Sequence, residues 1–68
     1  MRPLDQVLYY LSGSDSRLSS YDLAALIRRH DSYVRRLVTQ LRFTGMIDAT
    51  GTLTRRGEAY LGKILGAR

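Results

Sequence analysis

Residues 30–47 of this 68-residue chain read "HDSYVRRLVTQLRFTGMI" and decide its fold. Their apolar members recur at helical spacing and predict a helix over about residues 32–44, capped by Asp31 or Ser32 and stopped at Gly45. The buried stripe of this helix is Val34, Leu37, Val38 and Leu41. Its other side carries mainly polar and basic groups: Ser32, Tyr33, Arg35, Arg36, Thr39 and Gln40. The stretch therefore predicts a helix that packs by one side and presents hydrogen-bonding groups on the other.

The same periodicity predicts three further helices, over about residues 3–12, 20–28 and 55–65. Pro3 suits the first turn of the first helix. Ser19 and Asp22 have the spacing of a capping box at the start of the second. Thr54 is placed to cap the last one.

Between the third and fourth helices, residues 46–54 predict a small β-hairpin. Thr50-Gly51 is a short turn between two very short β segments. Because a lone hairpin is not stable in water, Met46, Ile47 and Leu53 are expected to pack against the helices. The expected fold is thus mainly α with one hairpin, in a single domain over residues 1–68.

Composition narrows the class of protein. The chain has no cysteine, which excludes disulfides and is consistent with a reducing, cytoplasmic location. No apolar run approaches the roughly 20 residues of a membrane span, and the N-terminal segment reads as a helix, not as a signal peptide. The net charge is +5, and all of the excess lies in residues 35–68, since residues 1–34 carry equal numbers of basic and acidic side chains. A polyanionic partner is the first interpretation of that asymmetry.

Residues 19–47, "SSYDLAALIRRHDSYVRRLVTQLRFTGMI", resemble the winged helix-turn-helix of bacterial, archaeal and phage regulators. The matching features are "DLA" at the start of the second helix, "VRR" in the third and "GMI" before the hairpin. The family's tail, "LT…G…YL", is matched by "LTRRGEAYL" at residues 53–61. The resemblance implies that the hairpin is a wing. It also implies that the third helix enters the major groove of double-stranded DNA, as in a transcriptional regulator.

The side chains on the exposed side of the third helix suit that role. Arginine bonds to guanine in bidentate fashion, glutamine to adenine, and a threonine methyl group contacts that of thymine. We expect Arg36 and Gln40 to read bases, with Arg35 at the edge of the same face. The full predicted base-reading set is Ser32, Tyr33, Arg35, Arg36, Thr39 and Gln40. The alternative is a solvated face that happens to be basic.

Phosphate contacts are predicted at the starts of two helices. A helix N-terminus offers free backbone N–H groups to an anion. At the second helix the candidates are Ser19, Ser20 and Tyr21, with simple capping by Ser19 as the alternative. Arg55 and Arg56 follow the wing, where a phosphate would offset the unfavourable position of cations at a helix N-terminus.

A second copy of the chain is a further expected partner. The broad apolar face of the last helix predicts a homodimer that forms through Tyr60, Leu61, Ile64 and Leu65. The alternative is that these residues only close the core of the monomer. Phe43 falls on the polar side of the third helix and is expected to pack under the wing, or otherwise against a partner chain.

The sequence contains no evident catalytic, metal-binding or cofactor-binding site. His30 is the only histidine, and no metal-ligand set, nucleophile–histidine pairing or Gly-rich phosphate loop is found in the sequence. We therefore expect neither an enzyme nor a cofactor, a metal or a small-molecule effector.

The predicted function is sequence-specific binding of double-stranded DNA by a repressor that occludes its site. The alternatives are a winged-helix module for protein–protein interaction, and an architectural or recombination accessory factor that bends DNA.

Overall fold

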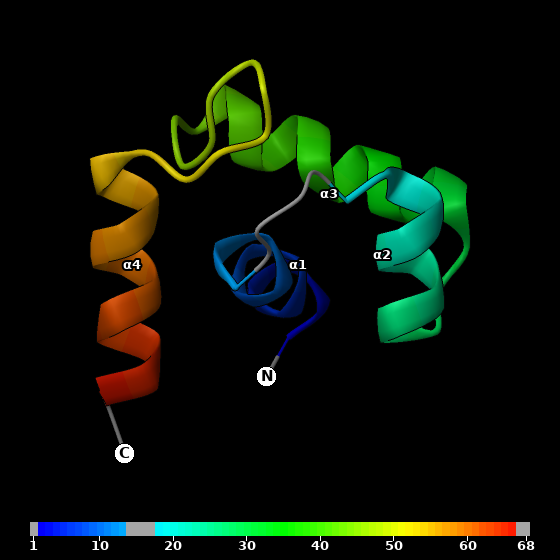
Figure 1. Ribbon diagram of the computed structural model, residues 1–68, viewed down its shortest axis with the longest axis horizontal. Coiled ribbons are helices and arrows are strands. Elements are labelled where there is room, and N and C mark those ends of the chain that lie inside the picture. Colours follow the sequence, from blue (N-terminus) through cyan, green and yellow to red (C-terminus); the bar gives the residue numbers. More distant parts are fainter. Residues whose placement is uncertain (1, 14–17, 67–68) are drawn as a thin grey trace.

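Four helices form the computed structural model over the residues that it describes, 2–13 and 18–66 (Figure 1). They are α1 (Pro3–Ser12), α2 (Ser20–Ile27), α3 (Asp31–Phe43) and α4 (Arg55–Gly66). Each helix begins and ends within one residue of the bounds expected from its apolar periodicity.

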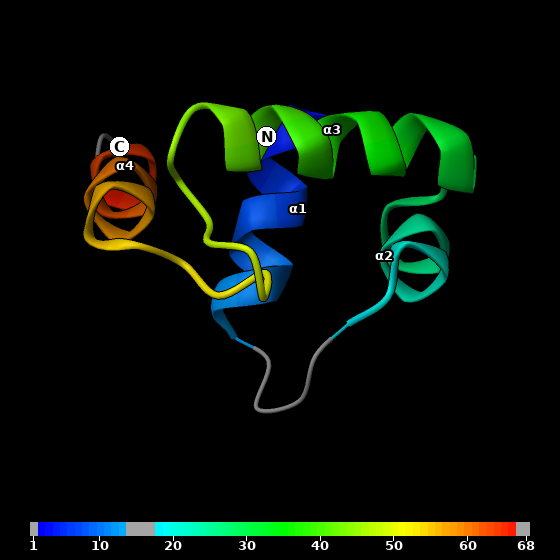
Figure 2. The ribbon, with the colours of Figure 1, turned by 90° about the horizontal axis from the view of Figure 1, so that it is seen from above.

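The helix α1 occupies the centre of the structure. It lies between α2 and α4, while α3 runs along one side of the molecule (Figures 1 and 2). α1 contacts each of the other three helices, and α2 also packs on α3. Val7 and Leu8 of α1 are completely buried for this reason. The remaining buried apolar side chains are Leu23, Ala24, Ile27, Val34, Leu37, Leu41, Ile47 and Leu61.

The start of α2 confirms the predicted capping box. The Ser19 hydroxyl accepts the backbone N–H of Asp22 at 3.1 Å, and the Asp22 carboxylate accepts the backbone N–H of Ser19 at 3.0 Å. At its other end, α2 stops at Arg28, whose φ of 58° is left-handed. This conformation turns the chain sharply from α2 into α3.

The predicted cap of α3 is wrong. The N-cap residue is His30, whose side chain makes no capping hydrogen bond, and Asp31 is already the first residue of the helix. Asp31 instead pairs with Arg35 one turn later, at 3.5 Å. The carboxylate still lies in the first turn, where it interacts favourably with the helix dipole.

The predicted β-hairpin wing is also wrong. The described part of the chain is helical without any β-strand, and residues 44–54, the α3–α4 connection, contain only an isolated bridge between Ile47 and Leu53. The reason lies in Asp48. Its carboxylate accepts the backbone N–H groups of Thr50 and Thr52 at 2.9 and 3.0 Å, so the Thr52 N–H, which would continue the ladder beyond the bridge, is engaged inside the loop.

The two ends of the connection are anchored tightly. Gly45, with φ of 82°, ends α3 in a Schellman motif in which the Met46 N–H donates to the Leu41 carbonyl at 2.9 Å. Thr54 caps α4 as predicted, because its hydroxyl accepts the N–H of Gly57 at 3.2 Å. Gly57 lies so close to the backbone of Met46 that a β-carbon there would overlap the Met46 carbonyl oxygen. This contact requires glycine at position 57.

Candidate nucleic-acid interface on α3

The inner side of α3 fixes the direction of its outer side. Val34 and Leu41 are almost completely inaccessible, and Leu37 is buried with them against α1 and α2. The other side of the helix therefore faces away from the core. α3 runs along one side of the molecule (Figure 2), and the residues on its outer side are exposed to solvent.

Six exposed or largely exposed side chains form a shallow surface on this outer side. We call it the α3 outer surface, and its residues are Ser32, Arg35, Arg36, Thr39, Gln40 and Phe43. Five of them belong to the base-reading set predicted from the sequence. The structure thus places these five side by side on one exposed face.

Tyr33, the sixth predicted base reader, lies apart from this surface. It lines a separate depression together with Arg28, Arg29 and His30. The guanidinium of Arg29 sits 5.9 Å from the centre of the Tyr33 ring, within the range of a cation–π contact. Tyr33 is therefore grouped with the basic turn between α2 and α3.

The members of the α3 outer surface differ in their partners within the chain. Arg35 forms an ion pair with Asp31, and the Thr39 hydroxyl donates to the Arg35 carbonyl at 2.9 Å. The side chains of Arg36 and Gln40 have no hydrogen bond or ion pair with any residue that the structure describes. Their donors and acceptors, one helical turn apart, are available to a partner.

Phe43 is the residue whose placement sequence reasoning missed. It was expected under the wing, but its side chain is 90% exposed at the C-terminal end of the α3 outer surface. The only signal in the sequence was its helical position on the polar side of α3.

The predicted phosphate residues at the start of α2 have different surroundings. The Ser19 hydroxyl both accepts from the Asp22 N–H and donates to the Asp22 carboxylate at 3.0 Å, so its hydrogen-bonding capacity is used within the cap. Ser20 is half-buried. Tyr21 is 71% exposed and its side chain, unlike that of the also exposed Ser19, makes no hydrogen bond within the described residues, so it is the one of the three that is available to a phosphate.

The two arginines at the start of α4 also differ. Arg56 donates from Nη1 to the Thr44 carbonyl at 3.3 Å and so binds the C-terminal end of α3. Arg55 is exposed and makes no hydrogen bond or ion pair with the described residues. Arg55 is the freer of the two for a phosphate.

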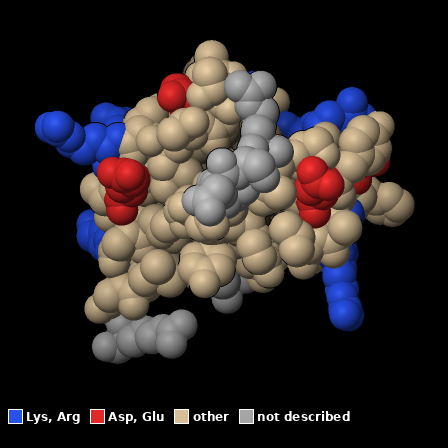
Figure 3. Space-filling model, viewed as in Figure 1, with Lys and Arg blue, Asp and Glu red and all other residues tan. Residues whose placement is uncertain are grey.

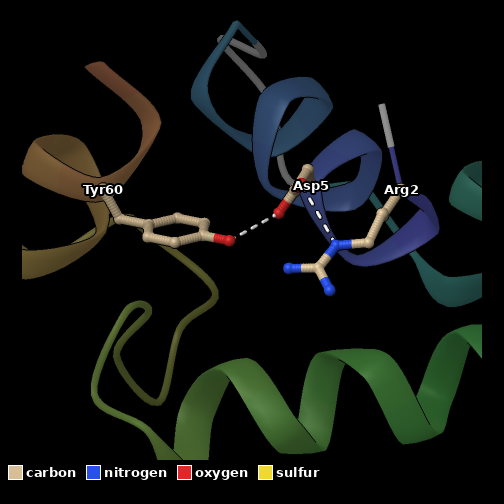
Figure 4. A network of polar contacts seen from close by, with 3 residues as sticks. All are labelled: Arg2, Asp5 and Tyr60. Carbon is tan, nitrogen blue, oxygen red and sulfur yellow. Dashed lines mark hydrogen bonds and ion pairs between the residues drawn. The ribbon is translucent and has the colours of Figure 1, made fainter. Parts of the chain in front are cut away.

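The four residues proposed for a dimer are only partly accessible. Leu61 is buried in the core, and Ile64 is half-buried. The Tyr60 hydroxyl donates to the Asp5 carboxylate at 2.9 Å, which joins α4 to α1 (Figure 4). Leu65 alone among them is classed as exposed, at 39%. Tyr60 and Leu61 therefore have clear roles within the monomer.

Asp5 is a second residue whose role the sequence did not reveal. It is a buried acid, 6% exposed, held between the Tyr60 hydroxyl and the Nε of Arg2 at 3.9 Å (Figure 4). The one available signal was an acid within a short apolar segment. Its polar partner comes from the other end of the chain, so spacing along the sequence does not identify it.

Charge is distributed unevenly over the molecule. α3 runs along the side that is turned away from the viewer in Figure 1, and Figure 3 shows the face toward the viewer. On that visible face, acidic and uncharged side chains occupy most of the surface, while Lys and Arg lie at its margins. The basic residues of the second half of the chain are thus not gathered over that face.

Comparison with known proteins adds no relative. No protein-family model matches the chain, and neither does any curated protein or solved structure. Within residues 2–13 and 18–66, no helix has the length and apolar character to cross a membrane. Over the same residues, no group of three histidine or acidic side chains is arranged to hold a metal ion.

Proposed function

We propose that this protein binds double-stranded DNA and reads its sequence with α3 in the major groove. The observation that carries the proposal is the pair Arg36 and Gln40. Both are exposed on the same side of α3, and neither is paired with another described residue. A guanidinium and an amide that are both free, one turn apart, can bond to the base edges that the major groove presents.

The roles of the side chains follow from their chemistry. Arg36 reaches guanine O6 and N7, and Gln40 reaches N6 and N7 of adenine. Arg35, already paired with Asp31, contributes at the edge of the surface, to a base or to a phosphate. Ser32, near the N-terminus of α3, donates its hydroxyl to the DNA backbone.

The arrangement of α2 and α3 supports this docking. α2 packs on α3, and the left-handed residue Arg28 makes a tight turn between them, as a helix-turn-helix requires. The order of the first three helices is the one that the resemblance to helix-turn-helix regulators implies. Tyr21 at the start of α2 and Arg55 at the start of α4 supply phosphate contacts, and the net charge of +5 attracts the polyanion.

In the cell, the proposed role is that of a cytoplasmic transcriptional regulator that represses by occupying its site. A homodimer would bind two half-sites about one helical turn apart. Leu65, with the half-buried Ile64, is the apolar surface of α4 that remains for such a contact.

The test is selection from a random duplex pool, followed by titration of the recovered sequence at several salt concentrations. If about five phosphates are neutralised, log affinity should fall against log salt with a slope of roughly −4 to −5. Arg36→Ala should abolish the preference for the recovered motif. Lys63→Ala is the control, because it also removes one positive charge, from an exposed position on α4. This variant should retain the preference.

A single observation favours a second function, protein–protein interaction. Phe43 is almost fully exposed, and large exposed aromatic side chains are typical of binding surfaces. If no duplex binds at any salt concentration, this second function replaces the first. Salt-dependent binding without an enriched motif would instead indicate an architectural DNA-binding protein.

A further inference from the structure

The α3 outer surface contains an apolar element that hydrogen bonding to bases does not use. Phe43 lies one helical turn beyond Thr39, on the same surface as Arg36 and Gln40. Because the Thr39 hydroxyl is directed back to the Arg35 carbonyl, its methyl group is the part of that side chain that remains for a partner. Thr39 and Phe43 thus form an apolar pair between polar and basic neighbours.

We infer that this pair recognises the C5-methyl groups of thymine in the major groove. The inference rests on the proposed function and extends it to the base composition of the site. Thymine is the base that presents a methyl group in that groove, where threonine methyl groups and phenylalanine contact it. The basic side chain Arg35 beside the pair matches the charge of the phosphates that flank such a base.

The spacing of the pair fits stacked bases. Residues 39 and 43 are separated by about 6 Å along the helix axis, from a rise of about 1.5 Å per residue. Base pairs are about 3.4 Å apart, so the two side chains reach thymines that are neighbours or one step apart. Arg36 and Gln40, in the same two turns, set the adjoining guanine and adenine contacts. The preferred site therefore contains thymines next to a guanine.

The experiment compares the duplex recovered by selection with the same duplex in which deoxyuridine replaces thymine. Deoxyuridine keeps every hydrogen-bonding group and lacks only the methyl. Each contacted methyl is worth about fourfold in affinity, so the wild-type protein should bind the thymine duplex roughly 15-fold more tightly if two are contacted. For Phe43→Ala, this ratio should fall to about 4.

Two variants make the result specific. Thr39→Ser removes the methyl group and retains the hydroxyl that bonds to the Arg35 carbonyl, and it should also lower the ratio to about 4. Leu26→Ala removes an exposed apolar side chain from α2 and should leave the ratio unchanged. Because Phe43 is 90% exposed, its replacement should not change the thermal unfolding of the protein.

The outcomes separate the inference from the proposed function. Equal binding of the thymine and deoxyuridine duplexes would overturn the methyl contact and leave DNA recognition intact. A recovered motif without thymine would overturn it too. If no duplex binds at all, both fail together. If Phe43→Ala changes only the mass of the protein in light scattering, its side chain docks a second copy of the chain, and the inference is wrong.

Discussion

The two sides of α3 differ in where their contacts are made. On the inner side, Val34, Leu37 and Leu41 are buried by α1 and α2. On the outer side, the side chains of Arg36 and Gln40 make no hydrogen bond or ion pair with the described residues, and Phe43 is 90% exposed. The inner side therefore accounts for stability and the outer side is available for binding, and the following predictions test that division.

The largest expected effect is on the inner side. Leu41→Ala should lower the free energy of unfolding by about 2–5 kcal/mol, because it leaves a cavity at the centre of a small core. Urea denaturation followed by circular dichroism measures this. Phe43→Ala, two residues away on the outer side, is the control and should stay within about 0.5 kcal/mol of wild type. Equal stability of the two variants would contradict the division.

The end of α3 depends on the approach of α4. Gly57→Ala should destabilise the protein by about 1–3 kcal/mol, since the new β-carbon would overlap the Met46 carbonyl. Gly62→Ala is the matched control in the same helix, because a β-carbon there meets nothing within 4 Å. Alanine favours helix, so this control should be more stable than wild type by up to about 1 kcal/mol. Similar melting temperatures for the two variants would exclude the close approach.

On the outer side, the neighbouring arginines should differ. Arg36→Ala should weaken binding to the selected duplex by about 1–3 kcal/mol, the range of a bidentate base contact. Arg35→Ala should weaken it less, because Arg35 is shared with Asp31. Fluorescence anisotropy at fixed salt gives both affinities, and unfolding of both variants should match wild type. A larger loss for Arg35→Ala would reverse the assignment of the two residues.

Loss of the hydrogen bond between Tyr60 of α4 and Asp5 of α1 should have a smaller effect. Tyr60→Phe removes the hydroxyl that donates to the buried Asp5 carboxylate, and the expected loss of stability is about 1 kcal/mol. Tyr21→Phe, which alters an exposed phenol, is the control and should not change the melting temperature. If the two variants melt alike, the hydroxyl contributes nothing to holding α4.

The smallest effect is expected in the exposed α3–α4 connection and depends on pH. The hydroxyl of Thr50 and the backbone N–H of Thr52 hold the pKa of Asp48 below its ordinary value. A carboxylate with a lowered pKa stabilises the fold above the ordinary carboxyl pKa, and this contribution is lost as the pH falls through the lowered value. The melting temperature of wild type should exceed that of Asp48→Ala at pH 7, and the difference should shrink below about pH 4. A difference that is independent of pH would contradict this role.

Local signals in the sequence were sufficient where an element depends on its own residues. The apolar period located the helices, and Ser19 and Asp22 located the start of α2, because a capping box closes within four residues. The hairpin prediction failed since the β pattern of residues 46–54 competes with the Asp48 carboxylate, which takes the Thr52 N–H that a longer ladder needs. For the candidate site, helical spacing gathered five residues of the α3 outer surface. It did not show which of them are already paired.

The sequence by itself determined the helices, the excess of positive charge and the two-sided character of α3, since periodicity and charge are properties of the chain in order. Only the tertiary structure decided that Asp5 meets Tyr60 across 55 positions, that Gly57 touches the backbone of Met46 and that Phe43 is left uncovered. The physical reason is the same in each case. Such contacts depend on where separate helices pack, and packing is set by the whole core, not by any one segment.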